Sequence, residues 1–232
     1  MRSRKLIASL IGVIALFTLP MLVSAQSTFQ TLFDFDLWDG KLPRTSILDK
    51  AGNLYGITQG GGTSSDGVIF KLAPNADGNW TRTILHNFSG LDGATPFTSL
   101  TIDQAGNLYG TTPFGGASGG YGVVFQLVPN SNGTWTENVL HSFNGTDGYL
   151  PAGGVIFDQA GNLYGTTGYG TAEGGGAPSL TGVVFELTPS ADHTAWTETV
   201  LHSFCAHGGA CADGAYPAAG LIMDREIGRA HV

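Results

Sequence analysis

The chain has 232 residues and a formal net charge of −8, and charged residues make up only 12% of it. No lysine or arginine occurs between Arg82 and Arg225, so the chain lacks a basic surface that could neutralise phosphates or anionic lipid. These features exclude nucleic acid as a partner. The apolar fraction of 42% is ample for a packed core and excludes a disordered chain.

The first 25 residues have the pattern of an export signal. Met1 to Lys5 is basic, Leu6 to Val23 is almost wholly apolar, and Val23-Ser-Ala25 supplies the small residues that a signal peptidase recognises. We therefore expect cleavage after Ala25, a secreted or cell-surface protein, and no membrane insertion of the mature chain. A retained transmembrane anchor is the alternative, because the apolar run approaches the roughly 20 residues that span a bilayer.

The rest of the chain repeats itself with a period of about 54 residues. The phrase Asp-x-Ala-Gly-Asn-Leu-Tyr-Gly occurs at Asp49–Gly56, Asp103–Gly110 and Asp158–Gly165. Each copy is followed by a Gly-Val-x-Phe run, a tryptophan, a Leu-His pair and the connection Asp-Gly-x-x-Pro. We expect one repeat domain over residues 26–225, with units at about 41–93, 94–148 and 149–214 and a partial unit at 215–225.

Each unit contains four segments with the character of strands. In the second unit these segments are Ser99–Asp103, Asn107–Thr112, Gly122–Val128 and Trp135–Phe143. Four antiparallel strands in a unit of this length fit the blade of a β-propeller better than the coil of a solenoid. We therefore expect an all-β, β-propeller-like array of tandem four-stranded blades.

The strand alternation predicts which side chains share a face. In the third segment it buries Val123, Phe125 and Leu127, whereas the opposite face can reach water because its central position is Lys71, Gln126 or Glu186 in the three units. In the fourth segment it places five side chains on one face: Trp135, Glu137, Val139, His141 and Phe143.

The two ends of the repeat array are fragments. Phe29–Phe35 has the pattern of a fourth strand without its preceding three, as expected of a strand that completes the last blade of a closed ring. Three full units fall short of the common number of about 4 to 8 blades. We therefore expect an incomplete ring from a longer protein.

The fourth unit is interrupted after Asp224. There the repeat predicts x-Ala-Gly-Asn-Leu-Tyr-Gly, but the chain continues Arg225-Glu-Ile-Gly-Arg-Ala-His-Val232. One back-translation of residues 226–232, GAG ATC GGA AGA GCA CAC GTC, resembles a short-read sequencing adapter. We interpret residues 226–232 as an adapter scar rather than as natural sequence.

The two cysteines, Cys205 and Cys211, lie in an insertion that the earlier units lack. In an oxidising compartment, two cysteines so close together predict a local disulfide. A zinc site is the less favoured alternative, since His207 is the one further ligand nearby and a structural zinc ion takes four. We expect neither a metal nor a cofactor.

The repeated phrases, in this order and at this spacing, resemble the GloVer (Gloeo/Verruco) tandem-repeat family of exported bacterial proteins. The resemblance spans Phe29 to Asp224. It implies a secreted or surface repeat protein, often with an interchangeable C-terminal sorting anchor, which here would lie beyond Arg225. It implies no established catalytic activity.

Residues that recur in every unit are explained first by the scaffold. Converging imidazoles could bind a metal, but we favour hydrogen-bonded structural roles for His86, His141 and His202. Repeated aspartates could suggest calcium, but we interpret three of them as side chains that bond the turn backbone: Asp49, Asp103 and Asp158. The same applies to the aspartates that precede glycine at tight connections: Asp92, Asp147 and Asp213.

The residue pattern favours binding over catalysis. Gly116–Gly120 matches the sequence motif of a nucleophile elbow, but the motif requires a following helix and no helix pattern follows it. The loops that vary between units are better candidates, and they carry Phe114, Tyr121, Tyr169 and Glu173. We expect a non-catalytic module that binds or displays an extracellular glycan or a surface protein there. The alternative is an extracellular polysaccharide hydrolase or lyase whose catalytic residues lie in missing blades.

Overall fold

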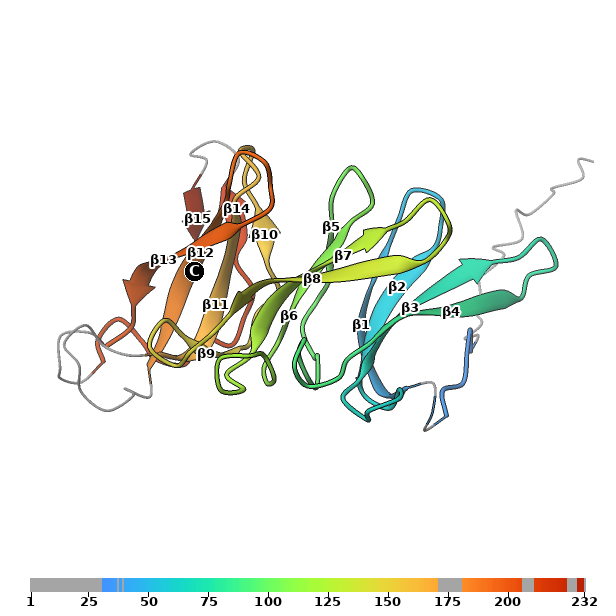
Figure 1. Ribbon diagram of the computed structural model, residues 1–232, viewed down its shortest axis with the longest axis horizontal. Coiled ribbons are helices and arrows are strands. Elements are labelled where there is room, and N and C mark those ends of the chain that lie inside the picture. The colour runs from blue at the N-terminus through green and yellow to red at the C-terminus, as the bar shows by residue number, and fades with distance from the viewer. Residues whose placement is uncertain are drawn as a thin grey trace, which may run out of the picture. The chain divides into compact units, whose positions relative to one another are not determined.

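The computed structural model describes residues 31–36, 38, 40–170, 181–205, 211–224 and 229–231. The chain divides into two units, Met1–Thr31 and Leu32–Val232, and every sheet belongs to the second (Figure 1). The described residues form strands and turns without a helix, so none of them forms a helix long and apolar enough to cross a membrane.

The strands pair in chain order into antiparallel sheets, one for each repeat unit. The first sheet contains β1 (Lys41–Leu48), β2 (Leu54–Gly60), β3 (Val68–Pro74) and β4 (Trp80–Asn87). The second contains β5 (Thr101–Ile102), β6 (Leu108–Thr112), β7 (Val123–Pro129) and β8 (Trp135–Ser142). The expected four antiparallel strands are confirmed in both units.

The third sheet repeats this order and gains one strand. It contains β10 (Ile156–Phe157), β11 (Leu163–Gly170), β12 (Thr181–Pro189) and β13 (Trp196–Ser203), and β9 (Tyr149–Pro151) pairs with β11 as well. A fourth, two-stranded sheet contains β14 (Ile222–Asp224) and β15 (Arg229–His231). None of the described sheets closes into a barrel.

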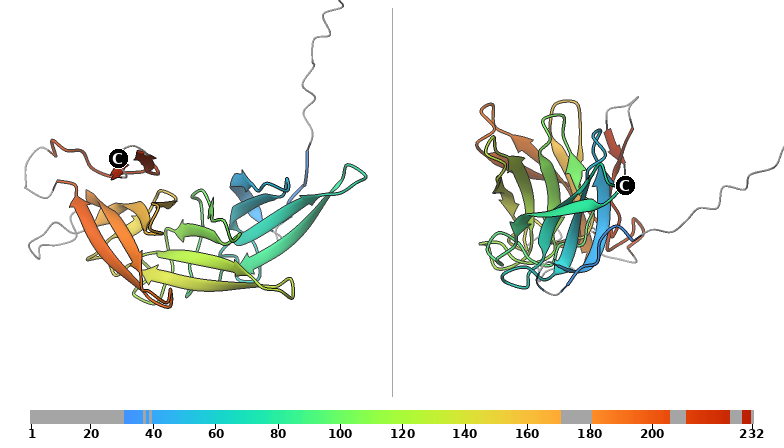
Figure 2. Two further views of the ribbon diagram at one scale, coloured as in Figure 1. Left: turned by 90° about the horizontal axis from the view of Figure 1, so that it is seen from above. Right: turned by 90° about the vertical axis from the view of Figure 1, so that its right-hand side faces the viewer.

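Neighbouring sheets bury their faces against each other (Figure 2). Between the first and second sheets, the Phe88 and Phe125 rings meet edge to face with their centroids 5.3 Å apart. Phe143 and Phe185 meet at 5.2 Å between the second and third. Between these two sheets the buried Thr111 hydroxyl also donates a hydrogen bond to the Gly153 carbonyl at 3.0 Å. The core therefore lies between the sheets.

The central strand β7 buries apolar side chains on both faces, which corrects in part the expectation that one face reaches water. Phe125 and Leu127 pack into the core shared with the first sheet, as expected. Val124, on the opposite face, is fully buried in the core shared with the third sheet. On that face Gln126 is only half-buried, and its side-chain amide donates to the Tyr109 hydroxyl at 2.8 Å.

A β-bulge in β8 changes which of its side chains share a face. Phe125 stands opposite Val139, but Val124 stands opposite His141, so one extra residue of β8 separates the two pairs. Trp135 therefore faces the first sheet, whereas Phe143 packs into the core with the third. The expectation that these side chains share one face is wrong, because the bulge shifts the alternation by one residue.

The N-terminal segment covers the outer face of the first sheet without forming a strand. Residues 31–36 have no strand assignment, so the strand expected at Phe29–Phe35 is not found in its described part. Phe35 nevertheless packs edge to face on Phe70 at 4.8 Å. Phe35 therefore has the same relation to Phe70 that Phe88 has to Phe125.

The last glycine of the repeated phrase makes room for the core phenylalanine. Gly110 in β6 stands opposite Phe125 in β7, and a Cβ at Gly110 would lie 2.7 Å from the tip of the Phe125 ring. The first and third units have the same cross-strand pair, Gly56 with Phe70 and Gly165 with Phe185. In each unit the phenylalanine ring therefore packs directly against the glycine on the neighbouring strand.

We predict that Gly110→Ala destabilises the chain by about 1–3 kcal/mol, because the added methyl group displaces the Phe125 ring from a packed core. Denaturant unfolding measures this change. Gly168→Ala in β11 is the matched control, since its Cβ would meet no atom closer than 3.5 Å. Equal stability loss in the two variants would contradict the role assigned to Gly110.

Candidate functional site

The aspartates of the repeated phrase organise their own turns. Asp49 Oδ1 accepts hydrogen bonds from the backbone N–H groups of Ala51 and Asn53, both at 2.9 Å. Its Oδ2 accepts from the Asn53 side-chain amide at 2.7 Å and from the Tyr55 hydroxyl at 3.2 Å. Asp103 and Asp158 accept the same bonds from Asn107 and Asn162. The predicted turn-bonding role is confirmed.

These turns line a wide depression of about 1440 Å³. Its lining includes the three turn aspartates and the aromatic residues Tyr55, Tyr109 and Trp196. The hydrogen bonds within the turns already engage all three carboxylates. The carboxylates are therefore not free to coordinate a ligand, and the depression is a weak candidate for a site.

Each repeated histidine bonds to the aspartate of the connection that follows it. His86 Nε2 lies 3.1 Å from Asp92 Oδ2, and His141 Nε2 lies 3.1 Å from Asp147 Oδ2. The corresponding distance between His202 and the more exposed Asp213 is 3.2 Å. The three pairs are separate, so the histidines do not converge, and each lies within hydrogen-bonding distance of its aspartate, as expected.

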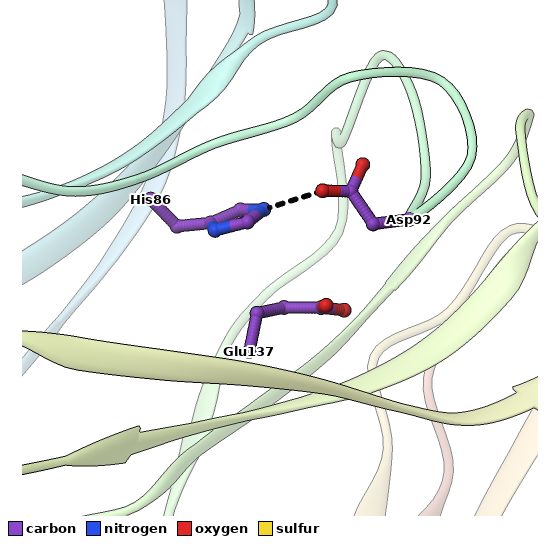
Figure 3. Close-up of side chains that lie close together, drawn as sticks. All are labelled: His86, Asp92 and Glu137. Carbon is purple, nitrogen blue, oxygen red and sulfur yellow. Dashed lines mark hydrogen bonds and ion pairs between the residues drawn. The ribbon is translucent and has the colours of Figure 1, made fainter.

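A glutamate from the next unit meets each of the first two pairs. Glu137 in β8 lies beside His86 and Asp92, with one ligand atom of each residue within 4.8 Å of the others (Figure 3). Its Oε1 is buried without a hydrogen-bond partner. Burial, with the Asp92 charge adding to it, raises the pKa of Glu137 to about 8. Sequence analysis missed this contact because His86 and Asp92 belong to the preceding unit and lie far from Glu137 in sequence.

The same arrangement recurs at the next interface. Glu198 in β13 also has a buried Oε1 without a partner. Burial raises the pKa of Glu198 to about 7, with His141 opposing the shift and Asp147 adding to it. Where the N-terminal segment meets the first sheet, Arg82 takes this position, and its guanidinium lies 4.8 Å from the centre of the Phe33 ring, a cation–π contact.

We predict that Glu198→Gln becomes increasingly more stable than the wild type as the pH rises from about 4.5 to about 7. The raised pKa means that the folded chain holds this proton more tightly than the unfolded chain, so wild-type stability is lost as the pH rises through that window. Glutamine stays neutral throughout. His141 and Asp147, which face Glu198, are present in both proteins.

Urea unfolding at several pH values, with EDTA present, measures the difference between the two proteins. The difference should stay constant above about pH 7, since Glu198 is then ionised in both states. A constant difference from pH 4.5 to 7 would show that Glu198 does not hold a proton in the folded chain.

Four tyrosines form a continuous row that runs from the second unit through the third to the partial fourth unit. The centroids of neighbouring rings are 5.3 to 5.4 Å apart along the order Tyr121, Tyr149, Tyr169 and Tyr216. The rings at the two ends are the more open ones, with 37% of Tyr121 and 48% of Tyr216 exposed. The row therefore offers an exposed aromatic surface.

The tyrosine row joins two of the residues that sequence analysis singled out. Tyr149, which that analysis missed, bridges Tyr121 and Tyr169. Phe114 is exposed one residue before Gly115, which pairs with Tyr121. Glu173 lies outside the described residues. Tyr149 and Tyr216 occupy variable positions of the connection Asp-Gly-x-x-Pro. They could have been noticed in the sequence because the other units have no aromatic residue at these positions.

The predicted disulfide between Cys205 and Cys211 is present. The Cys205 backbone N–H also donates to the Asp213 carboxylate at 3.1 Å. The insertion is therefore tied to the aspartate that bonds His202.

Comparison with known proteins identifies the repeat. The model of a family described as the Gloeobacter/Verrucomicrobia repeat matches residues 15–177, which is more than half of the chain. The match confirms the resemblance seen in the repeated phrases, although it starts and ends earlier than Phe29 to Asp224. No curated protein matches the chain.

Proposed function

Because the chain belongs to the Gloeobacter/Verrucomicrobia repeat family, we propose that it is a secreted or cell-surface module that binds extracellular glycans without catalysis. The export-signal pattern at residues 1–25 supports the location. The disulfide between Cys205 and Cys211 supports it as well, since such bonds persist in oxidising compartments outside the cytosol.

The tyrosine row is the observation that carries the binding proposal. Tyrosine rings offer rigid apolar faces, and each has a hydroxyl that can hydrogen-bond. The axial C–H groups of a sugar ring pack on such faces, and its hydroxyl groups bond to the polar tips. A row of four rings in contact matches several consecutive sugars better than a single small molecule.

The charge of the chain selects among glycans. The repeat has no lysine or arginine between Arg82 and Arg225, and the chain carries a net charge of −8. An anionic polysaccharide would be repelled by this surface at low ionic strength. The proposed ligand is therefore a neutral polysaccharide.

The scaffold that holds the row is, in this proposal, a set of propeller blades. The three successive sheets pack face to face through shared cores, as blades do. Such packing holds the connections between sheets rigid. Tyr149 and Tyr216 lie in or after these connections, so the row would be ordered before a ligand arrives, which lowers the entropic cost of binding.

We predict that Tyr149→Ala weakens binding to a neutral polysaccharide by at least about fivefold, because removing this inner ring separates Tyr121 from the other two rings. A glycan array selects the polysaccharide, and affinity electrophoresis in gels containing it gives the dissociation constant. Trp38→Ala is the matched control, since this aromatic residue is 82% exposed and lies outside the row.

Two results would contradict the proposed site. One is unchanged affinity of a folded Tyr149→Ala chain. The other is an equal loss of affinity in Trp38→Ala, which would show that the gel detects non-specific binding by exposed aromatic side chains.

A further inference from the structure

The interface between the first and second sheets gathers three side chains that can bind a metal. His86 is in β4, Asp92 is in the connection after β4, and Glu137 is in β8 of the next unit (Figure 3). One ligand atom from each lies within 4.8 Å of the others. Within the part of the chain that the structure describes, no other group of three such side chains is this close.

One carboxylate oxygen of this group has no hydrogen-bond partner, and a second one bonds to the His86 imidazole. Glu137 Oε1 is buried without a hydrogen-bond partner, a costly state that an ion would relieve. Asp92 is held by Ser89, whose backbone N–H and hydroxyl both bond to Oδ1, at 2.8 and 3.1 Å. Oδ2 of Asp92 is left to face the His86 imidazole at 3.1 Å.

The interface between the second and third sheets has the same three residue types but differs in one hydrogen bond. His141, Asp147 and Glu198 repeat the three residue types, and Glu198 Oε1 also lacks a partner. There, however, Asn144 replaces Ser89, and its side-chain amide bonds to Asp147 Oδ2 at 2.8 Å. Asp147 Oδ2 therefore bonds both to the Asn144 amide and to His141, whereas Asp92 Oδ2 bonds to the imidazole without an amide donor.

We propose that His86, Asp92 and Glu137 bind a divalent transition-metal ion, with Zn²⁺ as the best fit, between the first two sheets. One imidazole nitrogen and two carboxylate oxygens are ligands that zinc accepts, and its fourth position would hold water. Calcium fits less well, since it takes 6 to 8 oxygens. Because the ligands come from two units, the ion would bind the folded chain only and stabilise the contact between the sheets.

Isothermal titration of the EDTA-stripped, intact chain with Zn²⁺ tests the proposal. Glu137→Gln should weaken Zn²⁺ binding by at least about tenfold, since it replaces a charged ligand by a neutral amide. Glu198→Gln is the matched control at the next interface and should bind as the wild type does. Near-ultraviolet circular dichroism checks that both variants fold.

A second variant tests the availability of Asp92 Oδ2 without removing a ligand. Ser89→Asn introduces the amide found at Asn144 and should also weaken Zn²⁺ binding. In thermal unfolding, Zn²⁺ should raise the melting temperature of the wild type and of Glu198→Gln, but not that of Glu137→Gln. A wild-type chain that binds no Zn²⁺, or a folded Glu137→Gln chain that binds it as tightly as the wild type, would overturn the proposal.

Discussion

Each of the three larger sheets depends on a neighbour, because its inner strand β3, β7 or β12 buries apolar side chains on both faces. A sheet that is isolated in water would expose Val124 on one side and Phe125 on the other. Packing against the sheets before and after it buries both faces, and phenylalanine pairs form the centre of each contact. The interface between sheets is therefore the unit of stability in this chain, as in other repeat proteins whose units contact only their neighbours.

The polar side chains on the two sides of an interface vary together from one interface to the next, because packing brings them into contact. Where the preceding unit presents Phe33, the next unit places Arg82 over its ring. Where it presents a His–Asp pair, the next unit supplies Glu137 or Glu198. Each interface therefore has its own set of polar side chains, and the two glutamates keep one buried oxygen without a hydrogen-bond partner. The tyrosine row follows a different rule, since its positions vary between units. Tyr149 stands where the first two units have Lys41 and Ala94, and Tyr169 stands where they have Gly60 and Phe114.

Sequence predicted the parts of this structure that depend on neighbours along the chain. The four strands, the turn around Asp49 and the disulfide at Cys205 all involve residues close in sequence, and their patterns recur or stand out. The environment of Glu137 could not be predicted in this way, because its neighbours His86 and Asp92 come from the preceding unit. The faces of His141 and Phe143 were missed because one extra residue in β8 reverses the alternation before them. Tyr149 was missed for a related reason, since its partners come from a loop and a strand of two different units.

A double-mutant cycle on Phe143 and Phe185 tests most directly whether the sheets stabilise one another. Leucine at each position keeps an apolar side chain but removes the edge-to-face contact between rings 5.2 Å apart. The account predicts a coupling free energy of unfolding of about 0.5–1.5 kcal/mol between the two substitutions. Effects that add to within about 0.3 kcal/mol would contradict it, because the two rings would then contribute to stability independently of their contact across the interface.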